Sequence, residues 1–161
     1  MNKIYIIGSV GSGKTTLASI LSQKLKIEVY ELDKIVWDDD NGNVKRTDEN
    51  IAILFNEIIK KDSWIIEDVG RKKFVEGVRK ADIVYYINLS APIIYKRCVF
   101  RWIKQKIGLE KYNYKPTIKS LFKMLKWAKQ DITNKYIKIE YIKENSKRYK
   151  SKNSRRSRRK Y

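Results

Sequence analysis

The feature that most constrains this chain is the segment Gly8-Ser-Val-Gly-Ser-Gly-Lys-Thr15, which matches the pattern G-x-x-x-x-G-K-[S/T] at every fixed position. Glycines at these places let the backbone curl, so that successive N–H groups point inward at phosphate oxygens, and a following helix adds its positive end. In such loops the lysine reaches the β- and γ-phosphates of a nucleotide, and the final hydroxyl helps to hold Mg²⁺. The motif therefore predicts a phosphate-binding site for ATP, with Mg²⁺, at Gly8, Ser9, Gly11, Ser12, Gly13, Lys14, Thr15 and Thr16.

The segments around this motif alternate between two hydrophobic patterns. Residues 3–7 are nearly all apolar, as in a strand buried on both faces, and apolar residues recur at helical spacing from Thr15 to Leu25. Further strands are expected over 27–32, 64–66 and 83–89, and further helices over 47–61, 72–80, 91–107, 117–129 and 132–145. This alternation predicts an α/β chain with the three-layer αβα P-loop NTPase fold and a parallel sheet of four to five strands.

Composition limits the chemistry and the compartment. The chain has 37 Lys and Arg against 18 Asp and Glu, a formal charge of +19, which favours polyanionic partners such as nucleotides or nucleic acid. It has no histidine, so histidine triads and histidine zinc sites are excluded. A single cysteine, no secretory leader and no long apolar run lead us to expect a cytoplasmic protein without a membrane partner.

The end of the chain differs from the rest in composition. Residues 1–145 are expected to form one nucleotide-binding domain, whereas residues 146–161 contain no aliphatic side chain and are rich in Ser, Lys and Arg. We therefore expect 146–161 to be a basic, disordered tail, with no strand in it. A reading frame lost near Glu144 would account for such a tail.

Acidic side chains follow two of the predicted strands. In parallel α/β folds, ligands bind at the carboxyl ends of strands, where Asp33, Glu67 and Asp68 are expected. A carboxylate there could hold Mg²⁺ through water or accept a proton from an attacking hydroxyl. The run 38–40, also acidic, is better explained as a solvated loop.

Three arginines and one tryptophan complete the candidates. Arg97 and Arg101 stand four apart on one predicted helix, so they share a face, where a transferring phosphoryl group would suit two guanidinium groups. Arg71 lies just past the third strand and could bind the acceptor or the phosphate. Trp37 follows Asp33 beside a polar loop, and packing explains it least among the aromatic residues.

With these pieces the chain resembles the adenylate-kinase-like P-loop proteins, and within them the bacterial subgroup labelled DNA topology modulation proteins. The segments behind the resemblance are Gly8–Thr15, Glu31–Asp33 with Trp37, Trp64–Arg71, Ala81–Asp82, and Arg97 with Arg101. The resemblance implies a five-stranded core, a mobile lid at about 102–116, and phosphoryl transfer from ATP with Mg²⁺. Two departures stand out: Asp68-Val-Gly70 replaces the usual Asp-Gly, and no final strand is visible after Tyr141.

Three functions are consistent with these sequence features. The leading one is a kinase acting on a small hydroxyl- or phosphate-bearing acceptor, in which Lys14, Asp33, Arg97 and Arg101 are catalytic and Thr15 and Asp33 hold Mg²⁺. Its acceptor site is predicted at Asp33, Trp37, Glu67, Asp68 and Arg71. The second is a nucleotide-binding, nucleic-acid-associated protein with little catalysis, and the third is a kinase damaged at its C-terminus.

Overall fold

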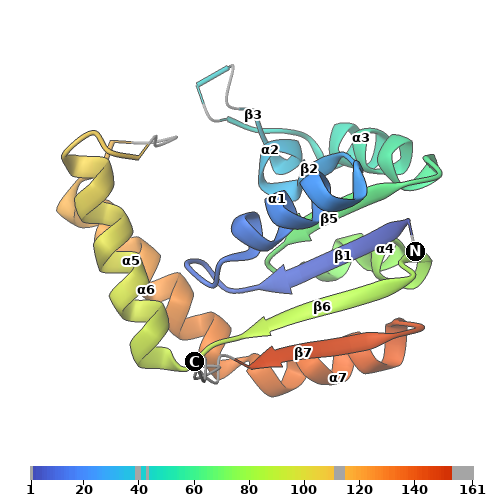
Figure 1. Cartoon of the computed structure of the whole chain (residues 1–161). Coiled ribbons are helices and arrows are strands. Elements are labelled where there is room, and N and C mark those ends of the chain that lie inside the picture. Colours follow the sequence, from blue (N-terminus) through green and yellow to red (C-terminus); the bar gives the residue numbers. More distant parts are fainter. Residues whose placement is uncertain (1, 39–40, 43, 111–114, 154–161) are drawn as a thin grey trace.

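A parallel sheet forms the centre of the molecule. The structure is a computed structural model that describes residues 2–38, 41–42, 44–110 and 115–153. Five strands lie in the order β2-β5-β1-β6-β7, with every neighbouring pair parallel. Figure 1 shows their carboxyl ends along one edge of the sheet. The strands are β1 (Lys3–Gly8), β2 (Val29–Glu31), β5 (Trp64–Asp68), β6 (Ile83–Asn88) and β7 (Tyr149–Asn153).

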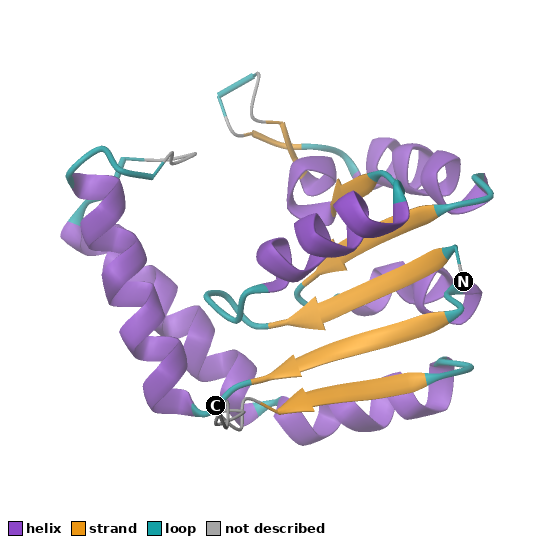
Figure 2. Ribbon diagram, in the orientation of Figure 1, coloured by secondary structure: helices purple, strands orange, loops and turns teal. Residues whose placement is uncertain are grey.

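Helices cover both faces of this sheet, so the predicted αβα fold is confirmed (Figure 2). Among the described residues, α1 (Lys14–Leu25) is the one helix on the first face, and the other helices that pack on the sheet cover the opposite face. The remaining elements are α2 (Leu32–Val36), the hairpin of β3 (Trp37–Asp38) and β4 (Val44–Lys45), α3 (Asp48–Lys60), the 3₁₀ turn η1 (Lys72–Phe74), α4 (Val75–Lys80), α5 (Ala91–Lys106), α6 (Ile118–Thr133) and α7 (Lys135–Asn145). No helix in these described ranges is long and apolar enough to cross a membrane.

The alternation of side chains along β1 divides the core in two. Ile4 and Ile6 point toward α1, whereas Tyr5 and Ile7 point toward the helices on the opposite face. All four are at most 1% exposed, as expected for a strand in the middle of a parallel sheet. Two large hydrophobic clusters therefore hold β1 in place, and the glycine loop begins where this strand ends.

A third hydrophobic cluster joins the α5–α6 pair to the glycine loop. Cys98 and Ile94 of α5 pack against Met124 and Ala128 of α6, and Val10 of the loop packs against the same cluster. In Figure 1 the two helices stand beside the carboxyl ends of the strands. Part of the predicted lid, residues 102–106, is thus the last turn of α5, while residues 111–114 lie outside the described part.

The expectation of a tail without a strand is wrong for residues 149–153. They form β7, paired in parallel with β6 from Val84↔Tyr149 to Asn88↔Asn153. Tyr149 packs against the larger cluster, and Lys150 lies on the opposite face. Backbone pairing with β6 and one half-buried aromatic ring are enough to place the strand, and a lysine at a sheet edge opposes pairing with other chains. A final strand thus exists without an aliphatic run, and residues 154–161 lie outside the described part.

A shortened chain tests the contribution of β7. Ending the chain at Ser146 removes the pairing with β6 and the packing of Tyr149, so the free energy of unfolding should fall by about 1.5–3 kcal/mol, the burial value of one large side chain. Thermal melts should show a drop of several degrees. A chain ending at Asn153 is the matched control and should melt like the parent. Equal melting of the two shortened chains would show that β7 adds no stability.

The second predicted strand is shorter than expected. The sequence predicts a strand over 27–32 that ends at Asp33, but β2 stops at Glu31 and α2 begins at Leu32. Leu32, Ile35 and Val36 are all buried, and their spacing fits one side of a helix. Asp33 therefore lies in the first turn of α2.

Candidate functional site

The glycine motif forms a curled loop between β1 and α1, as predicted. Gly11 and Gly13 have φ angles of 70° and 94°, in the left-handed region that residues with a Cβ seldom adopt. A Cβ on Gly8 would lie 2.6 Å from Ser12 Oγ. The backbone N–H of Ser12 donates to the carbonyl of Ser9 at 3.2 Å, which closes the turn. The loop therefore has the tight geometry that its glycines require.

Lys14 is buried at the start of α1. Its Nζ donates to the Ser9 carbonyl at 3.0 Å and lies 3.9 Å from Glu67 Oε1. Burial lowers the pKa of Lys14, while Glu67, Asp33, Asp68 and Asp131 oppose that shift. Lys14 therefore holds a buried ammonium at the glycine loop, from which the lysine of this motif can reach a phosphate.

Thr15 and Glu67 meet next to Lys14. Thr15 Oγ1 donates to Glu67 Oε1 at 3.0 Å, although the two residues are 52 positions apart. Within the described residues Glu67 Oε2 is buried without a hydrogen-bond partner. Burial raises the pKa of Glu67, and Lys14 and Thr15 act against this rise. A hydroxyl and a carboxylate with an open oxygen fit Mg²⁺, which prefers oxygen ligands.

Asp33, the other predicted magnesium residue, takes a different partner. Its carboxylate pairs with Arg71 Nη2, and its side chain is exposed. Arg71 Nη1 also donates to Asp68 Oδ1 at 2.6 Å, so one guanidinium bridges two acids. Thr16, predicted to bind nucleotide, is exposed in the first turn of α1.

Asp68 is buried and holds the loop after β5. Its Oδ2 accepts from the backbone N–H groups of Gly70 at 2.8 Å and of Arg71 at 2.6 Å, and the Tyr5 hydroxyl lies 3.5 Å away. Its side chain is 0% exposed. Asp68, predicted to be an acceptor-binding residue, is buried and orients Arg71, and its acceptor role stays a prediction. Arg71 and Asp33 are the members of this group that reach the surface.

The two arginines of α5 have separate partners. Arg97 Nη1 donates to the Ser12 carbonyl at 2.9 Å and reaches the Gly11 carbonyl at 3.5 Å, so it contacts the glycine loop from outside. Arg101 Nε pairs with Glu110 at 2.9 Å. The structure thus brings Arg97 to the loop and leaves Arg101 with an acid of the lid. Their catalytic roles stay predictions.

Trp37 lies apart from this cluster. It belongs to the β3–β4 hairpin, is 40% exposed, and its carbonyl accepts from Arg46 Nη1 at 2.9 Å. Figure 1 shows the hairpin beyond α2, away from the glycine loop. Asp38 pairs with Arg46, residues 39–40 are outside the described part, and no cluster of three potential metal ligands occurs within the described ranges.

Sequence reasoning missed two charged residues near the loop. Lys138 of α7 donates to the Val69 carbonyl at 2.8 Å and pairs with Asp131 of α6. Asp131 is also one of the acids that act on the pKa of Lys14. Val69 and Lys138 are 69 positions apart, so no local pattern could have linked them.

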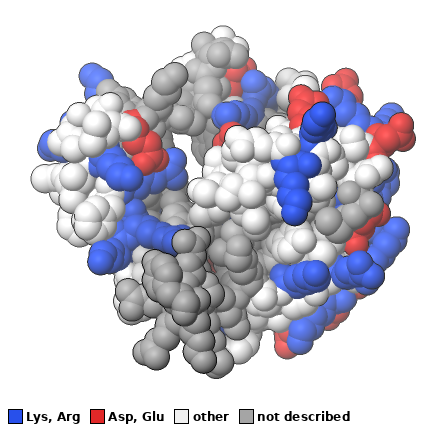
Figure 3. Space-filling view, in the orientation of Figure 1, with Lys and Arg blue, Asp and Glu red and all other residues white. Residues whose placement is uncertain are grey.

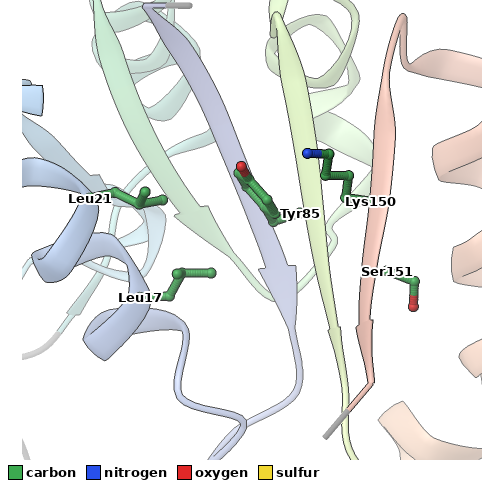
Figure 4. Close-up of a pocket in the computed structure, with 5 residues that line it drawn as sticks. All are labelled: Leu17, Leu21, Tyr85, Lys150 and Ser151. Carbon is green, nitrogen blue, oxygen red and sulfur yellow. The ribbon is translucent and has the colours of Figure 1, made fainter. Parts of the chain in front are cut away.

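Another hollow lies away from these residues. A cavity of about 390 Å³ lies between α1 and the β6–β7 edge, lined by Leu17, Leu21, Tyr85, Lys150 and Ser151 (Figure 4). None of these residues belongs to the predicted site, and the lining is mostly apolar.

The charge distribution gives the nucleic-acid alternative no site of its own on the face shown. In Figure 3 the basic side chains are scattered over the visible face of the described residues, with acidic side chains between them. The alternative rests on the net charge of +19 alone.

These observations define a class of protein. A curled glycine loop joins the first strand of a parallel sheet to its first helix, with Lys14 and Thr15 opening that helix and Glu67 on the neighbouring strand. This is the arrangement of a P-loop nucleotide-binding domain. Residues 4–114 match the family model described as AAA domain, and the chain belongs to that family.

Similar proteins include shikimate kinases. A 45-residue stretch is 36% identical to the shikimate kinase of Sulfurihydrogenibium sp. (strain YO3AOP1), covering 28% of this chain and 27% of that relative, about a quarter of its length. The structure of shikimate kinase from Bacteroides thetaiotaomicron superposes with a TM-score of 0.59 at 13% identity, covering 92% of this chain and 85% of that one. Shikimate kinase from Acinetobacter baumannii in complex with shikimate gives 0.57 at 15% identity, with 96% and 86% covered.

At these identities the structural neighbours show only that this chain and the two shikimate kinases share a fold. The finer resemblance to DNA topology modulation proteins stays a prediction.

Proposed function

We propose that this protein transfers the γ-phosphoryl group of ATP to a small acceptor. The observation behind the proposal is the convergence of Lys14, Thr15 and Glu67 at the glycine loop, where Glu67 Oε1 lies 3.0 Å from Thr15 Oγ1 and 3.9 Å from Lys14 Nζ. Support also comes from the fold, which is shared with kinases, one of them in complex with the small molecule shikimate.

In this proposal the residues around the loop have separate roles in phosphoryl transfer. The loop N–H groups and Lys14 hold the β- and γ-phosphates, and Thr15 and Glu67 are placed to hold Mg²⁺. Bound Mg²⁺ would neutralise charge on these phosphates. An acceptor hydroxyl oxygen bonds to the γ-phosphorus, the bond from that phosphorus to the β–γ bridging oxygen breaks, and ADP leaves.

The reaction also requires a group that accepts the proton of the acceptor hydroxyl and groups that neutralise the charge on the transferring phosphoryl group. Asp33 is the candidate acceptor of the hydroxyl proton, and Arg71 the candidate contact for the acceptor molecule. Arg97 already contacts the loop, whereas Arg101 would have to leave Glu110 to reach a transferring phosphoryl group. Closure of the α5–α6 end over the site would exclude water, so that the phosphoryl group reaches the acceptor instead of water.

An acceptor screen tests the proposal. The purified chain is incubated with ATP, Mg²⁺ and separate pools of nucleosides, nucleotides, sugars and hydroxy acids, and ADP formation is measured. We expect one pool to raise ADP formation well above the rate without acceptor, with a phosphorylated product visible by mass spectrometry. ATP binding without product formation in any pool would overturn the kinase proposal and favour a nucleotide-binding role.

Glu67→Gln tests the magnesium site. Removing the charge should weaken ATP·Mg²⁺ binding by about 10- to 100-fold, the usual effect of losing a group that orients a metal. Because burial raises the pKa of Glu67, the carboxyl must lose its proton before it can hold Mg²⁺. Mg²⁺-dependent affinity in the parent should therefore rise as pH increases through that pKa, and the variant should lose this pH dependence.

The same pKa shift has a consequence for stability without ligand. The pKa of Glu67 is higher in the folded state than in the unfolded chain, so its protonated form stabilises the fold. This stabilisation is complete below the ordinary glutamate pKa and is lost as pH rises through the pKa of the folded state. Glu67→Gln has no titrating carboxyl at this position, so its free energy of unfolding should not show this fall with rising pH. The control is Glu57→Gln, an exposed acid on α3. If both variants keep the parental Mg²⁺ dependence, Glu67 does not hold the metal.

A further inference from the structure

A small cavity lies beside the glycine loop, at the carboxyl end of β6. Its volume is about 120 Å³, and it is enclosed by the loop, the first residues of α5 and the junction of α6 with α7. The polar side chains in its lining include Ser9, Ser90, Asp131, Lys135 and Lys138. In Figure 1 the start of α5 and the α6–α7 junction lie beside the carboxyl end of β6.

Ser9 links this cavity to the nucleotide loop. Its carbonyl accepts from Lys14 Nζ at 3.0 Å, and its side chain lines the cavity. The residue is 8% exposed, and among the described residues its Oγ has no hydrogen-bond partner. A buried hydroxyl without a partner is costly, so its position points to a ligand that supplies the missing hydrogen bond.

The lining favours an anion. Lys135 and Lys138 supply two positive charges against one negative charge on Asp131. Lys138 is held by the Val69 carbonyl and by Asp131, which uses two of its three donors and leaves the ammonium beside the cavity. The 16-residue helix α5 begins at this cavity, and the Ser90 side chain makes no capping hydrogen bond there, so the positive end of the helix faces the same space.

The size of the cavity restricts what it can hold. A volume of about 120 Å³ corresponds to about four water molecules at roughly 30 Å³ each. One carboxylate or one phosphate group fits that space. Lys138, which lines the cavity, also donates to the carbonyl of Val69 in the loop after β5, two residues before Arg71.

We propose that this cavity binds the anionic group of the acceptor, a carboxylate or a phosphate, through Ser9, Lys135, Lys138 and the start of α5. The proposal rests on the proposed kinase function and narrows its substrate class. The acceptor is then a small hydroxy acid or sugar phosphate, whose hydroxyl end extends toward Arg71 and Asp33. Neutral nucleosides are excluded as efficient acceptors.

An anion titration tests this site on the full chain. The protein is saturated with a non-hydrolysable ATP analogue and Mg²⁺, and inorganic phosphate or acetate is added at constant ionic strength. Backbone amide shifts of Ser9 and Ala91 in NMR spectra report binding. We expect saturable shifts with one of the two anions, and the anion that binds tells phosphate from carboxylate acceptors.

Variants decide whether the cavity is responsible. Ser9→Ala and Lys135→Gln should each weaken anion binding about tenfold or more, because each removes a hydrogen bond to a charged ligand. Lys143→Gln, an exposed lysine on the same helix as Lys135 and absent from the cavity lining, should leave the affinity unchanged. Equal weakening by Lys135→Gln and Lys143→Gln, or shifts that never saturate with either anion, would overturn the proposal.

The same titration in the Lys14→Met variant distinguishes a failure of the anion site from a failure of the kinase function. In Lys14→Met without nucleotide, the glycine loop lacks its main cation, so anion-dependent shifts at Ala91 report the cavity itself. If the ATP analogue fails to bind the parent, the kinase function fails. The titration in Lys14→Met still shows whether the cavity binds anions.

Discussion

Replacing Lys14 with methionine should abolish the rise in melting temperature that we expect ATP·Mg²⁺ to give the parent protein. A ligand at 100 times its dissociation constant stabilises by about 2.7 kcal/mol, a shift of several degrees for a chain of this size. The variant loses the buried ammonium that we propose faces the phosphates, and phosphoryl transfer should fall by about 10²- to 10³-fold. Thermal melts and ADP formation measure the two effects.

The variant without ligand should remain folded. Burial lowers the pKa of Lys14, which shows that the fold disfavours its charge, and methionine keeps a similar length without that charge. The melting temperature without nucleotide should therefore match or exceed that of the parent. Lys24→Met, an exposed lysine on the same helix, is the control and should keep the full ATP response. An undiminished ATP shift in Lys14→Met would refute the phosphate-binding role of the loop.

Asp68→Ala should be the most destabilising single substitution in the site. Asp68 accepts from two backbone N–H groups and from the Arg71 guanidinium, and its side chain is fully buried. Removing one partner of a buried ion pair costs about 3–5 kcal/mol, and the lower end applies because Arg71 is partly exposed. The melting temperature should fall by roughly 6–12 °C, measured by calorimetry or circular dichroism.

Two further variants separate the parts of this network. Asp33→Ala removes the exposed partner of the same arginine, and exposed pairs contribute at most about 1 kcal/mol. Asp68→Ala combined with Arg71→Met should recover part of the lost stability, because the charge left without a partner is then Asp33, which is exposed to water. If Asp33→Ala proves as destabilising as Asp68→Ala, the assignment of Asp68 as the anchor of the loop is wrong.

Much of the fold follows from local patterns. The glycine motif predicts the curled loop and the start of α1, because glycines at fixed positions allow φ angles that other residues avoid. The apolar runs predict β1, β5 and β6, since strands in the middle of a parallel sheet are buried on both faces. Thr47 predicts the start of α3, where its side chain accepts from the N–H of Asn50.

The final strand shows where such patterns fail. Tyr149–Asn153 contains one aromatic residue among polar ones, which predicts no strand by itself. It becomes a strand because β6 offers a free edge of backbone groups and the larger cluster accepts the Tyr149 ring. Parallel pairing joins segments that are far apart in the chain. Whether residues 149–153 form a strand therefore depends on the free edge of β6 and not on their own sequence pattern.

The same division holds in the site. The sequence by itself determined which residues form the phosphate loop, because backbone curvature, Lys14 and Thr15 are specified within eight consecutive positions. It also determined that acids follow the strands. Only the tertiary structure decided their partners: Glu67 with Thr15, Asp68 as the buried support of Arg71, and Lys138 with Asp131 beside Ser9. The physical reason is that hydrogen bonding and burial, which separate these roles, depend on neighbours brought together by the sheet.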